Sequence, residues 1–230
     1  MSSEQIAWIA GSTGGIGGAC RSLLDSRGWT TFGSDRPDVD LSVAGSAEAW
    51  LPGVLAGRSL NGAVHAVGMS GRRLGDGPLS ACTEEGWESI LRVNLTSAFR
   101  FLKLALSNAS EGSSVVVIGS ALAKTLDEDF LTAAYRVSKA ALIPLVEAAA
   151  FEAAPRNVRV NVVSPGLVST PMAARALGDE RIQARFPELM PLGASPATAE
   201  EVAAAVGWLL GPDSTRTTGA VIPVDCGWSL

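Results

Sequence analysis

The chain has 230 residues, of which 47% are hydrophobic and 18% charged, so it holds ample apolar material for a folded core and shows no bias toward disorder. A formal charge of −5 and scattered arginines argue against nucleic acid as a partner. Three distant cysteines without C-x-x-C spacing and one histidine argue against a metal site. With neither a signal-peptide pattern nor a membrane-spanning segment, we expect a cytoplasmic protein that does not engage a membrane.

Short β-rich apolar runs alternate with longer helical stretches, a pattern typical of βαβ units. The predicted strands are residues 5–10, 29–34, 61–67, 114–120, 157–163 and 220–224, with 39–41 as a very short seventh. The predicted helices are residues 17–27, 47–55, 84–107, 132–154 and 199–210. Because crossovers between parallel strands are right-handed, this order predicts one doubly wound, Rossmann-type α/β domain over residues 1–230. Its central parallel sheet should have about seven strands, with helices on both faces.

Two segments interrupt the alternation and follow strand ends, where open α/β sheets bind ligands. Residues 68–81 are rich in glycine and contain Arg72 and Arg73, which fit either a carboxylate-binding site or a solvated loop. Residues 171–196 place apolar side chains at helical spacing, which fits either a partly apolar substrate pocket or the packing of a lid. These side chains are Met172, Leu177, Phe186 and Met190.

A glycine-rich loop directly follows the first predicted strand and opens the first helix. Glycines let the backbone turn sharply and approach a diphosphate, and the helix N-terminus attracts its charge. The loop has no Gly-Lys pair, so it is not a Walker A motif, and its spacing is G-x-x-x-G-x-G rather than G-x-G-x-x-G. An ordinary flexible turn is the alternative, but the position favours a nucleotide site. The loop consists of Gly11, Ser12, Thr13, Gly14, Gly15, Ile16 and Gly17.

The second predicted strand ends at Asp35, 24 residues after Gly11. A carboxylate there can accept hydrogen bonds from both adenosine ribose hydroxyls and repels a 2′-phosphate, which favours NAD(H) over NADP(H). Arg36 keeps NADP(H) possible, because a guanidinium can bind the additional phosphate. Alternatively, Asp35 caps a turn and Arg36 is solvated.

The predicted buried strand 114–120 ends at Ser120, whose hydroxyl should point into the ligand crevice. Ser120 could also cap a helix or turn. A serine hydrolase is disfavoured because the sequence after Ser120 lacks the second glycine of G-x-S-x-G and a triad would need the only histidine, His65.

The only tyrosine of the chain, Tyr135, precedes Lys139 by four residues in a predicted helix, so the two share one face. A phenol is a poor base at neutral pH, and a nearby ammonium favours its ionised form. The pair can therefore act as a general acid and base. A helix-surface pair is the alternative, but Tyr135 follows Ser120 by only 15 residues.

Over nearly its whole length the chain resembles the classical short-chain dehydrogenases/reductases. The residues that carry the resemblance are the glycine loop, Asn94, Ser120, Tyr135 with Lys139, Pro165-Gly166 and Asp225-Cys226-Gly227. The resemblance implies a catalytic tetrad in which Ser120 polarises the carbonyl, Tyr135 passes the proton and Lys139 lowers the tyrosine pKa and binds the nicotinamide ribose. Asn94 would hold a water that links Lys139 to solvent. From the residues alone, Asn94 could instead be a helix kink or a satisfied core group.

The resemblance also implies further cofactor contacts. Asp40 and Leu41 would meet the adenine, the turn Pro165-Gly166 would lie beside the nicotinamide, and the backbone of Val168 and the hydroxyl of Thr170 would meet its carboxamide. Without the resemblance, that turn could be a plain strand-to-loop turn.

Three features depart from the family pattern. His65-Ala66-Val67-Gly68 replaces Asn-Asn-Ala-Gly, so only Gly68 keeps its expected place against the cofactor and His65 is expected to be structural. The usual helix after Asp35 should be missing, because Asp40 follows too closely. Residues 124–130 form a slightly longer, acidic loop that should shape the substrate entrance.

The favoured function is hydride transfer between NAD(H) and a small secondary alcohol or ketone. An NADP(H)-dependent ketoreductase of a biosynthetic pathway is one alternative. A non-catalytic nucleotide-sensing relative that binds a partner protein is another, although such proteins usually lose the tyrosine or the lysine. The resemblance also implies a homotetramer or homodimer formed through residues 84–107 and 132–154.

Overall fold

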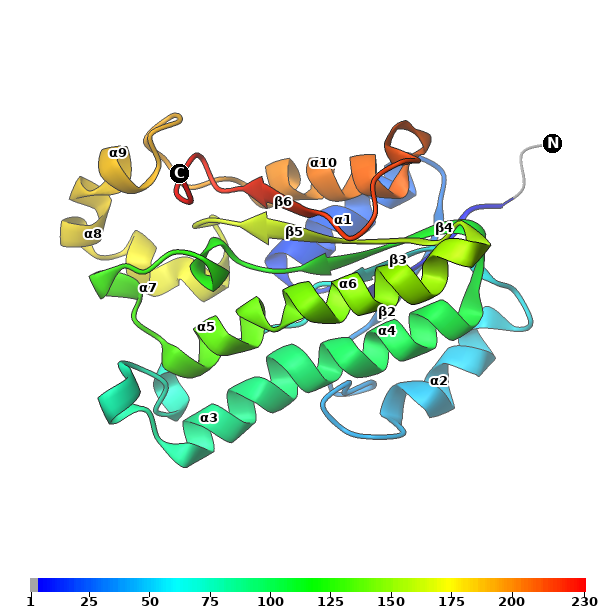
Figure 1. Cartoon of the computed structure of the whole chain (residues 1–230), viewed down its shortest axis with the longest axis horizontal. Helices are drawn as coiled ribbons and strands as arrows, with labels where there is room; N and C mark the ends of the chain where they lie inside the picture. The colour runs from blue at the N-terminus through cyan, green and yellow to red at the C-terminus, as the bar shows by residue number, and fades with distance from the viewer. Residues whose placement is uncertain (1–3) are drawn as a thin grey trace.

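The computed structural model describes residues 4–230 and contains one six-stranded parallel sheet. The strand order β2-β1-β3-β4-β5-β6 reverses direction next to β1, as in a doubly wound fold (Figure 1). The strands are β1 (Ile6–Ala10), β2 (Thr30–Ser34), β3 (Leu60–His65), β4 (Ala109–Ile118), β5 (Arg159–Pro165) and β6 (Val221–Val224). The predicted fold class is confirmed, with six strands rather than about seven.

The expected strand at residues 39–41 is wrong. The chain turns there, with the N–H of Val39 bonded to the carbonyl of Asp35 and that of Val43 to Asp40. Val39 and Leu41 are nevertheless buried, because they pack into the core beneath α2 (Ser46–Leu55). Their apolar character reflects packing from a loop, which short sequence patterns do not distinguish from a strand.

Helices cover both faces of the sheet, and alternate strand residues supply the two cores. The helices α1 (Gly15–Ser26) and α10 (Ala199–Leu210) pack together on one face, while α2, α4 (Ser97–Asn108) and α6 (Leu142–Ala153) cover the other (Figure 1). Along β1, Trp8 and Ala10 belong to the core beneath α2, α4 and α6, whereas Ala7 and Ile9 belong to the core beneath α1 and α10. This period of two is expected for a strand buried on both faces.

Two long predicted helices are interrupted. Residues 84–107 form α3 (Glu84–Ile90), a π-helical segment η3 (Leu91–Thr96) and α4. Residues 132–154 form α5 (Ala133–Ala140), a break at Ala141 and α6. Pro144 lies in the first turn of α6, where its missing N–H needs no helical partner, and this favours a new helix start there.

The carboxyl ends of the strands lie at one edge and are joined to short helical segments. Ala10 pairs with both Ser34 and His65, so the loops that follow β1, β2 and β3 begin side by side. The short helical segments at this edge of the sheet gather at the left of Figure 1. They are η1 (Arg72–Leu74), η2 (Leu79–Ala81), η4 (Ala121–Ala123), η5 (Glu128–Phe130), η7 (Pro171–Ala173), α7 (Ala174–Leu177), α8 (Glu180–Ala184) and α9 (Phe186–Leu189). Elsewhere, η6 (Ala154–Arg156) follows α6 and η8 (Pro212–Ser214) follows α10.

Apolar residues of the segment 171–196 form a small core of their own. Ile182 and Met190 are fully buried there, and Leu177 and Phe186 pack against them. Lid packing therefore accounts for most of the helical apolar pattern, whereas Met172 remains 53% exposed. Among residues 4–230, no helix combines the length and the apolar character needed to cross a bilayer.

Candidate active site

The glycine loop turns sharply between β1 and α1. Gly11 has φ +83°, and a Cβ on it would lie 2.9 Å from the backbone carbonyl carbon of Ala66. A Cβ on Gly17 would collide with the carbonyl of Gly11. Glycine is therefore required at both positions, as the G-x-x-x-G-x-G spacing predicts.

The N-terminus of α1 is open to an anion. Its N-cap, Gly14, provides no side-chain cap, and the first turn contains no acidic residue. Thr13, Gly14 and Gly15 are exposed, whereas Ser12 is buried and Ile16 packs against the core between α1 and the sheet. Free N–H groups at the positive end of a helix suit a diphosphate, so these residues fit a dinucleotide cofactor.

Asp35 lies one residue after β2 and faces this loop. Its carboxylate accepts hydrogen bonds from the Ser12 hydroxyl (2.5 Å), the Thr13 N–H (3.0 Å) and the Thr13 hydroxyl (2.8 Å). Partial burial opposes ionisation, but these hydrogen bonds outweigh it and hold the pKa of Asp35 below its ordinary value. Arg36, next to it, is exposed. Both residues thus lie at the end of β2, beside the loop, as predicted.

The predicted adenine-side residues follow in the turn. The Asp40 carboxylate accepts the Ser42 N–H at 2.8 Å. Partial burial opposes ionisation of Asp40, but the bonds to Ser42 and the charges of Arg36 and Arg100 lower its pKa. Leu41 is only 4% exposed, so its side chain belongs to the core.

Ser120 and Tyr135 come together just beyond β4. Ser120 is 7% exposed, and its hydroxyl oxygen accepts the N–H of Leu122 at 3.2 Å. Burial raises the pKa of the Tyr135 phenol, and a hydrogen bond with Ser120 partly opposes this. Ser120 and Tyr135, which the sequence separates by 15 residues, therefore lie close enough for the serine to influence the phenol.

Lys139 lies on the same face of α5 as Tyr135. Its Nζ donates to the carbonyl of Ile118 at 2.9 Å and lies 5.9 Å from the centroid of the Tyr135 ring. Burial lowers the pKa of Lys139 from 10.5 to about 8. In this arrangement burial dominates the tyrosine pKa, so the expected lowering of that pKa by Lys139 is not seen.

Asn94 is buried within the π-helical segment and joins three parts of the site. Its Oδ1 accepts the N–H of Met69 at 2.9 Å, and its Nδ2 donates to the carbonyl of Met69 (3.2 Å) and to the hydroxyl of Ser138 (3.1 Å). A Cβ built on Gly68 would lie 3.3 Å from Lys139 Nζ and 3.6 Å from Asn94 Oδ1. The four predicted catalytic residues are thus brought together, and Ser138 is a partner that the sequence analysis did not identify.

Residues after β5 approach the glycine loop. Pro165 ends β5, and the N–H of Gly166 donates to the carbonyl of Val224 at 3.0 Å. Val168 forms a bridge with Ala197. Thr170 approaches the glycine loop so closely that a Cβ on Gly15 would lie 2.5 Å from its Cγ2. The two predicted cofactor-binding segments therefore lie next to each other.

An ionic cluster ties the acidic loop to the segment 171–196. Arg185 pairs with Asp127 at 2.7 Å and also with Asp129, which Arg181 contacts as well. The carboxylate-bearing side chain of Asp129 is 3% exposed. The sequence shows the acidic loop but not its partners, which lie more than 50 residues away.

The backbone of the acidic loop also gathers arginines from both substrate-side segments. Arg72 and Arg175 each donate to the carbonyl of Asp129 at 2.9 Å. Burial and the neighbouring charge of Arg175 lower the pKa of Arg72. Arg73 is exposed. Arg72 is exposed as well, but of the two predicted arginines it is the one that donates to the acidic loop.

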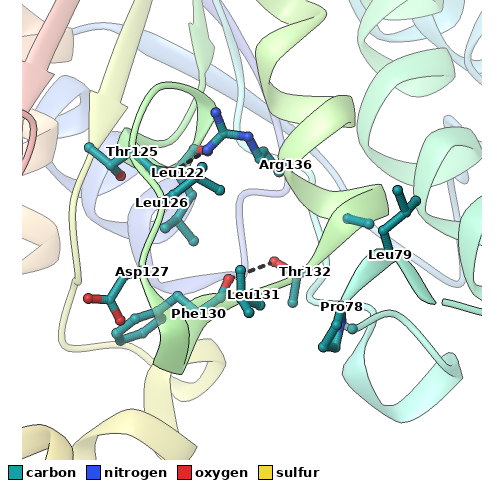
Figure 2. A pocket seen from close by; sticks show the side chains of 12 residues that line it. Pro78, Leu79, Leu122, Thr125, Leu126, Asp127, Phe130, Leu131, Thr132 and Arg136 are labelled. Atoms are coloured by element: carbon teal, nitrogen blue, oxygen red, sulfur yellow. Dashed lines mark hydrogen bonds between the residues drawn. The ribbon is translucent and has the colours of Figure 1, made fainter. Parts of the chain in front are cut away.

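A hollow of about 180 Å³ is lined in part by the acidic loop, and Figure 2 shows the mainly apolar side chains around it. Arg136 closes one side, where it donates to the carbonyls of Leu122 and Thr125. The hollow also borders Thr132 and Ala133, at the start of α5.

His65 is structural in its contacts. It is fully buried, its Nε2 lies 3.0 Å from the Ser97 hydroxyl, and its ring packs against Phe101. Burial, followed by the charge of Lys139, lowers its pKa to about 3. Within residues 4–230, no three His, Cys, Asp or Glu side chains form a group suited to a metal ion.

A glycine loop at an open helix N-terminus, a strand-end serine and a tyrosine beside a buried lysine on one Rossmann-type sheet are typical of nucleotide-dependent oxidoreductases. Sequence comparison agrees, because the family described as enoyl-(acyl carrier protein) reductase matches residues 30–229. The chain belongs to the short-chain dehydrogenase/reductase family.

Individual relatives match over most of their length. The chain is 32% identical to the short-chain dehydrogenase/reductase ABA4 of Pyricularia oryzae, over 96% of this chain and 90% of that protein. It is 30% identical to the monensin polyketide synthase putative ketoacyl reductase of Streptomyces virginiae, over 99% of this chain and 97% of that protein. The 3-oxoacyl-[acyl-carrier protein] reductase of Brucella melitensis, solved with NAD, shares the fold with a TM-score of 0.90. That likeness covers 100% of this chain and 98% of the other at 24% identity.

Proposed function

We propose that this protein transfers a hydride between NAD(H) and a small secondary alcohol or ketone, with Tyr135 as the general acid and base. The observation that carries the proposal is that the Lys139 ammonium lies 5.9 Å from the centroid of the Tyr135 ring and is bonded to the carbonyl of Ile118, two residues before Ser120. This group lies at the carboxyl edge of the sheet, beside an open helix N-terminus that suits a diphosphate. Family members act as oxidoreductases on alcohol and carbonyl groups.

Each residue has a distinct task in this proposal. Ser120 binds the substrate oxygen and polarises the carbonyl, while Tyr135 donates a proton to that oxygen in reduction and accepts it in oxidation. The ammonium of Lys139 favours the phenolate when it is charged. The bound nicotinamide supplies or accepts the hydride. Asn94, which borders Lys139 beside Gly68, holds a water that links Lys139 to solvent.

The proposed cofactor contacts follow the predicted residues. Gly11–Gly17 hold the diphosphate, and Asp35 binds the adenosine ribose once its bonds to Ser12 and Thr13 rearrange. Asp40 and Leu41 flank the adenine. The nicotinamide lies against the segment from Pro165 through Gly166 and Val168 to Thr170, with Lys139 on its ribose.

A second candidate is an NADP(H)-dependent ketoreductase. The exposed Arg36 beside Asp35 supports it, because a guanidinium at the end of β2 can bind a 2′-phosphate. The name of the Streptomyces virginiae relative, a putative ketoacyl reductase, points the same way. Relative kcat/KM values with NADPH and NADH separate the two candidates.

The test of the main proposal is turnover by the purified protein. We expect oxidation of NADH or NADPH in the presence of ketones and β-ketoacyl thioesters, and loss of that activity by about 10²–10⁴-fold in Tyr135→Phe. Cofactor binding without turnover of any such compound would overturn the proposal and favour a nucleotide-sensing protein. Unchanged activity of Tyr135→Phe would remove Tyr135 from the reaction.

We further propose that residues 1–230 act as one domain and assemble as a homodimer or homotetramer. A hollow of about 550 Å³ between α4 and α6 supports an assembly face, because Phe99 on its rim is 52% exposed. We also propose a cytoplasmic location, which fractionation of the host cell would test.

A further inference from the structure

A buried carboxylate outside the proposed catalytic set caps the helix that carries Tyr135. Asp76 is 5% exposed, and its Oδ1 accepts the N–H of Ala134 while its Oδ2 accepts the N–H of Tyr135, both at 3.0 Å. The N-cap residue, Thr132, makes no capping bond with its own side chain. Asp76 thus satisfies two of the free N–H groups in the first turn of α5 from 58 residues away.

The loop around Asp76 holds the carboxylate rigidly. The N–H of Asp76 donates to the carbonyl of Gly71 at 3.0 Å. A Cβ on Gly71 would lie 2.7 Å from the Asp76 Cβ, and a Cβ on Gly86 would lie 2.9 Å from the Asp76 nitrogen. Such close packing between this loop and α3 leaves the carboxylate little freedom, so it is in place before any substrate binds.

The same substrate-side segment also reaches the carbonyl of Tyr135. That carbonyl accepts the Ser138 hydroxyl at 2.7 Å, Ser138 accepts the amide of Asn94, and Asn94 is bonded to both backbone groups of Met69. The segment 68–81 therefore holds Tyr135 by its N–H through Asp76 and, through Asn94, by its carbonyl.

Several titratable groups face this arrangement. The Sγ of Cys82 lies 3.8 Å from Asp76 Oδ1, and Arg72 is close enough to interact with the charge of Asp76. On the other side of the helix turn, Tyr135 faces Ser120 and Lys139. A negative charge at the first turn offsets the positive end of α5 and disfavours a second negative charge on the phenol.

We propose that Asp76 is a positioning residue for Tyr135: its carboxylate fixes the first turn of α5 so that the phenol meets Ser120, and its charge opposes premature ionisation of the phenol. The hydrogen bonds of Asp76 to α5 go to the backbone N–H groups of Ala134 and Tyr135, and none goes to Ser120 or Lys139. The effect on kcat rests on the proposed function, whereas the effect on tyrosine ionisation does not.

The experiment compares Asp76→Ala and Asp76→Asn with Thr198→Ala. Thr198 caps α10 with a capping box on the opposite face of the sheet, so its removal provides a comparable loss of helix capping away from Tyr135. Steady-state kinetics and tyrosinate absorbance are measured for each variant. Tyr135 is the only tyrosine, and the six tryptophans do not titrate, so the absorbance reports on this phenol alone.

We expect kcat of Asp76→Ala to fall about tenfold to a hundredfold with KM changed by less than about twofold, because a displaced acid slows the chemical step more than substrate binding. Asp76→Asn keeps one acceptor oxygen and should recover part of kcat. In both variants the tyrosinate should form at lower pH than in the wild type, because the opposing charge is gone. Thr198→Ala should leave kcat and the tyrosine titration unchanged.

The proposal is overturned if Asp76→Ala loses thermal stability as Thr198→Ala does but keeps the wild-type kcat and tyrosine titration. If Asp76→Ala does not fold, the same comparison is made with Asp76→Asn, and a wild-type titration in that variant overturns the proposal. If the wild type turns over no carbonyl compound, the proposed function fails while the tyrosine titration still decides the role of Asp76.

Discussion

The ammonium of Lys139 donates a hydrogen bond of 2.9 Å to the backbone carbonyl of Ile118, the last residue of β4. This bond ties the helix that carries Tyr135 to the strand that precedes Ser120. Burial lowers the pKa of Lys139 from 10.5 to about 8. Because the unfolded chain restores the ordinary pKa, folding and protonation of Lys139 are linked.

The first prediction concerns this linkage. Between pH 8 and 10.5 the unfolded state holds a proton on Lys139 that the folded state has lost. Below pH 8 the buried charge of Lys139 therefore lowers the free energy of unfolding by its full amount, and this loss disappears as the pH rises to 10.5. From pH 7 to 10.5, the free energy of unfolding of the wild type should rise by about 3 kcal/mol relative to that of Lys139→Met. Urea unfolding of both proteins across this range measures the difference. A difference that does not change with pH would contradict the depressed pKa.

The second prediction concerns the ion pairs that hold the segment 171–196. The Arg185 side chain is 21% exposed and pairs with three carboxylates, those of Asp127, Asp129 and Glu188, whereas the Arg181 side chain is 62% exposed. Because exposed ion pairs contribute little, Arg185→Met should loosen the segment far more than Arg181→Met does. We expect limited proteolysis within 171–196 to accelerate about tenfold in Arg185→Met, through more frequent local opening. Equal cleavage rates in the two variants would show that these pairs do not close the lid.

The sequence allows the order of elements to be predicted because each strand and helix has its own local signals. The helix at residues 199–210 has the predicted bounds because Thr198 and Glu201 form a capping box at its start. The interruption of residues 84–107 has no such local cause. It coincides with Asn94, whose bonds to Met69 and Ser138 depend on the tertiary fold.

Some residues of the candidate site can likewise be recognised from the sequence, whereas others are revealed only by the tertiary fold. Glycines, Ser120, Tyr135 and Lys139 are recognisable because their chemistry and spacing are specific. Asp76 gives no local signal, because a carboxylate in a glycine-rich loop usually caps its own turn rather than a helix 58 residues later. Nor does spacing reveal that Asp35 already binds Ser12 and Thr13.

The third prediction concerns assembly. Phe99 on α4 borders the hollow between α4 and α6 and is 52% exposed, which is costly for a large aromatic side chain unless a partner covers it. A charge there would have to be buried in the proposed interface, so Phe99→Glu should reduce the molar mass in solution toward that of one chain. Light scattering after size-exclusion chromatography measures this. Leu126→Glu, at a 71% exposed position that does not border the hollow between α4 and α6, is the control and should leave the mass unchanged. An unchanged mass in Phe99→Glu would exclude this face.

The fourth prediction concerns cofactor choice. The Asp35 carboxylate is held by Ser12 and Thr13 beside the glycine loop, where it would repel a 2′-phosphate. Asp35→Ser should therefore raise the ratio of kcat/KM for NADPH to that for NADH by about tenfold or more, since it removes a charge that opposes one cofactor and a bond that favours the other. The control is Asp25→Ser, because Asp25 is an exposed carboxylate on α1 whose partners are the Thr31 hydroxyl and the exposed Arg21. The same ratio in Asp35→Ser and the wild type would show that Asp35 serves the loop rather than the ribose, and Arg36 would then be the residue to replace.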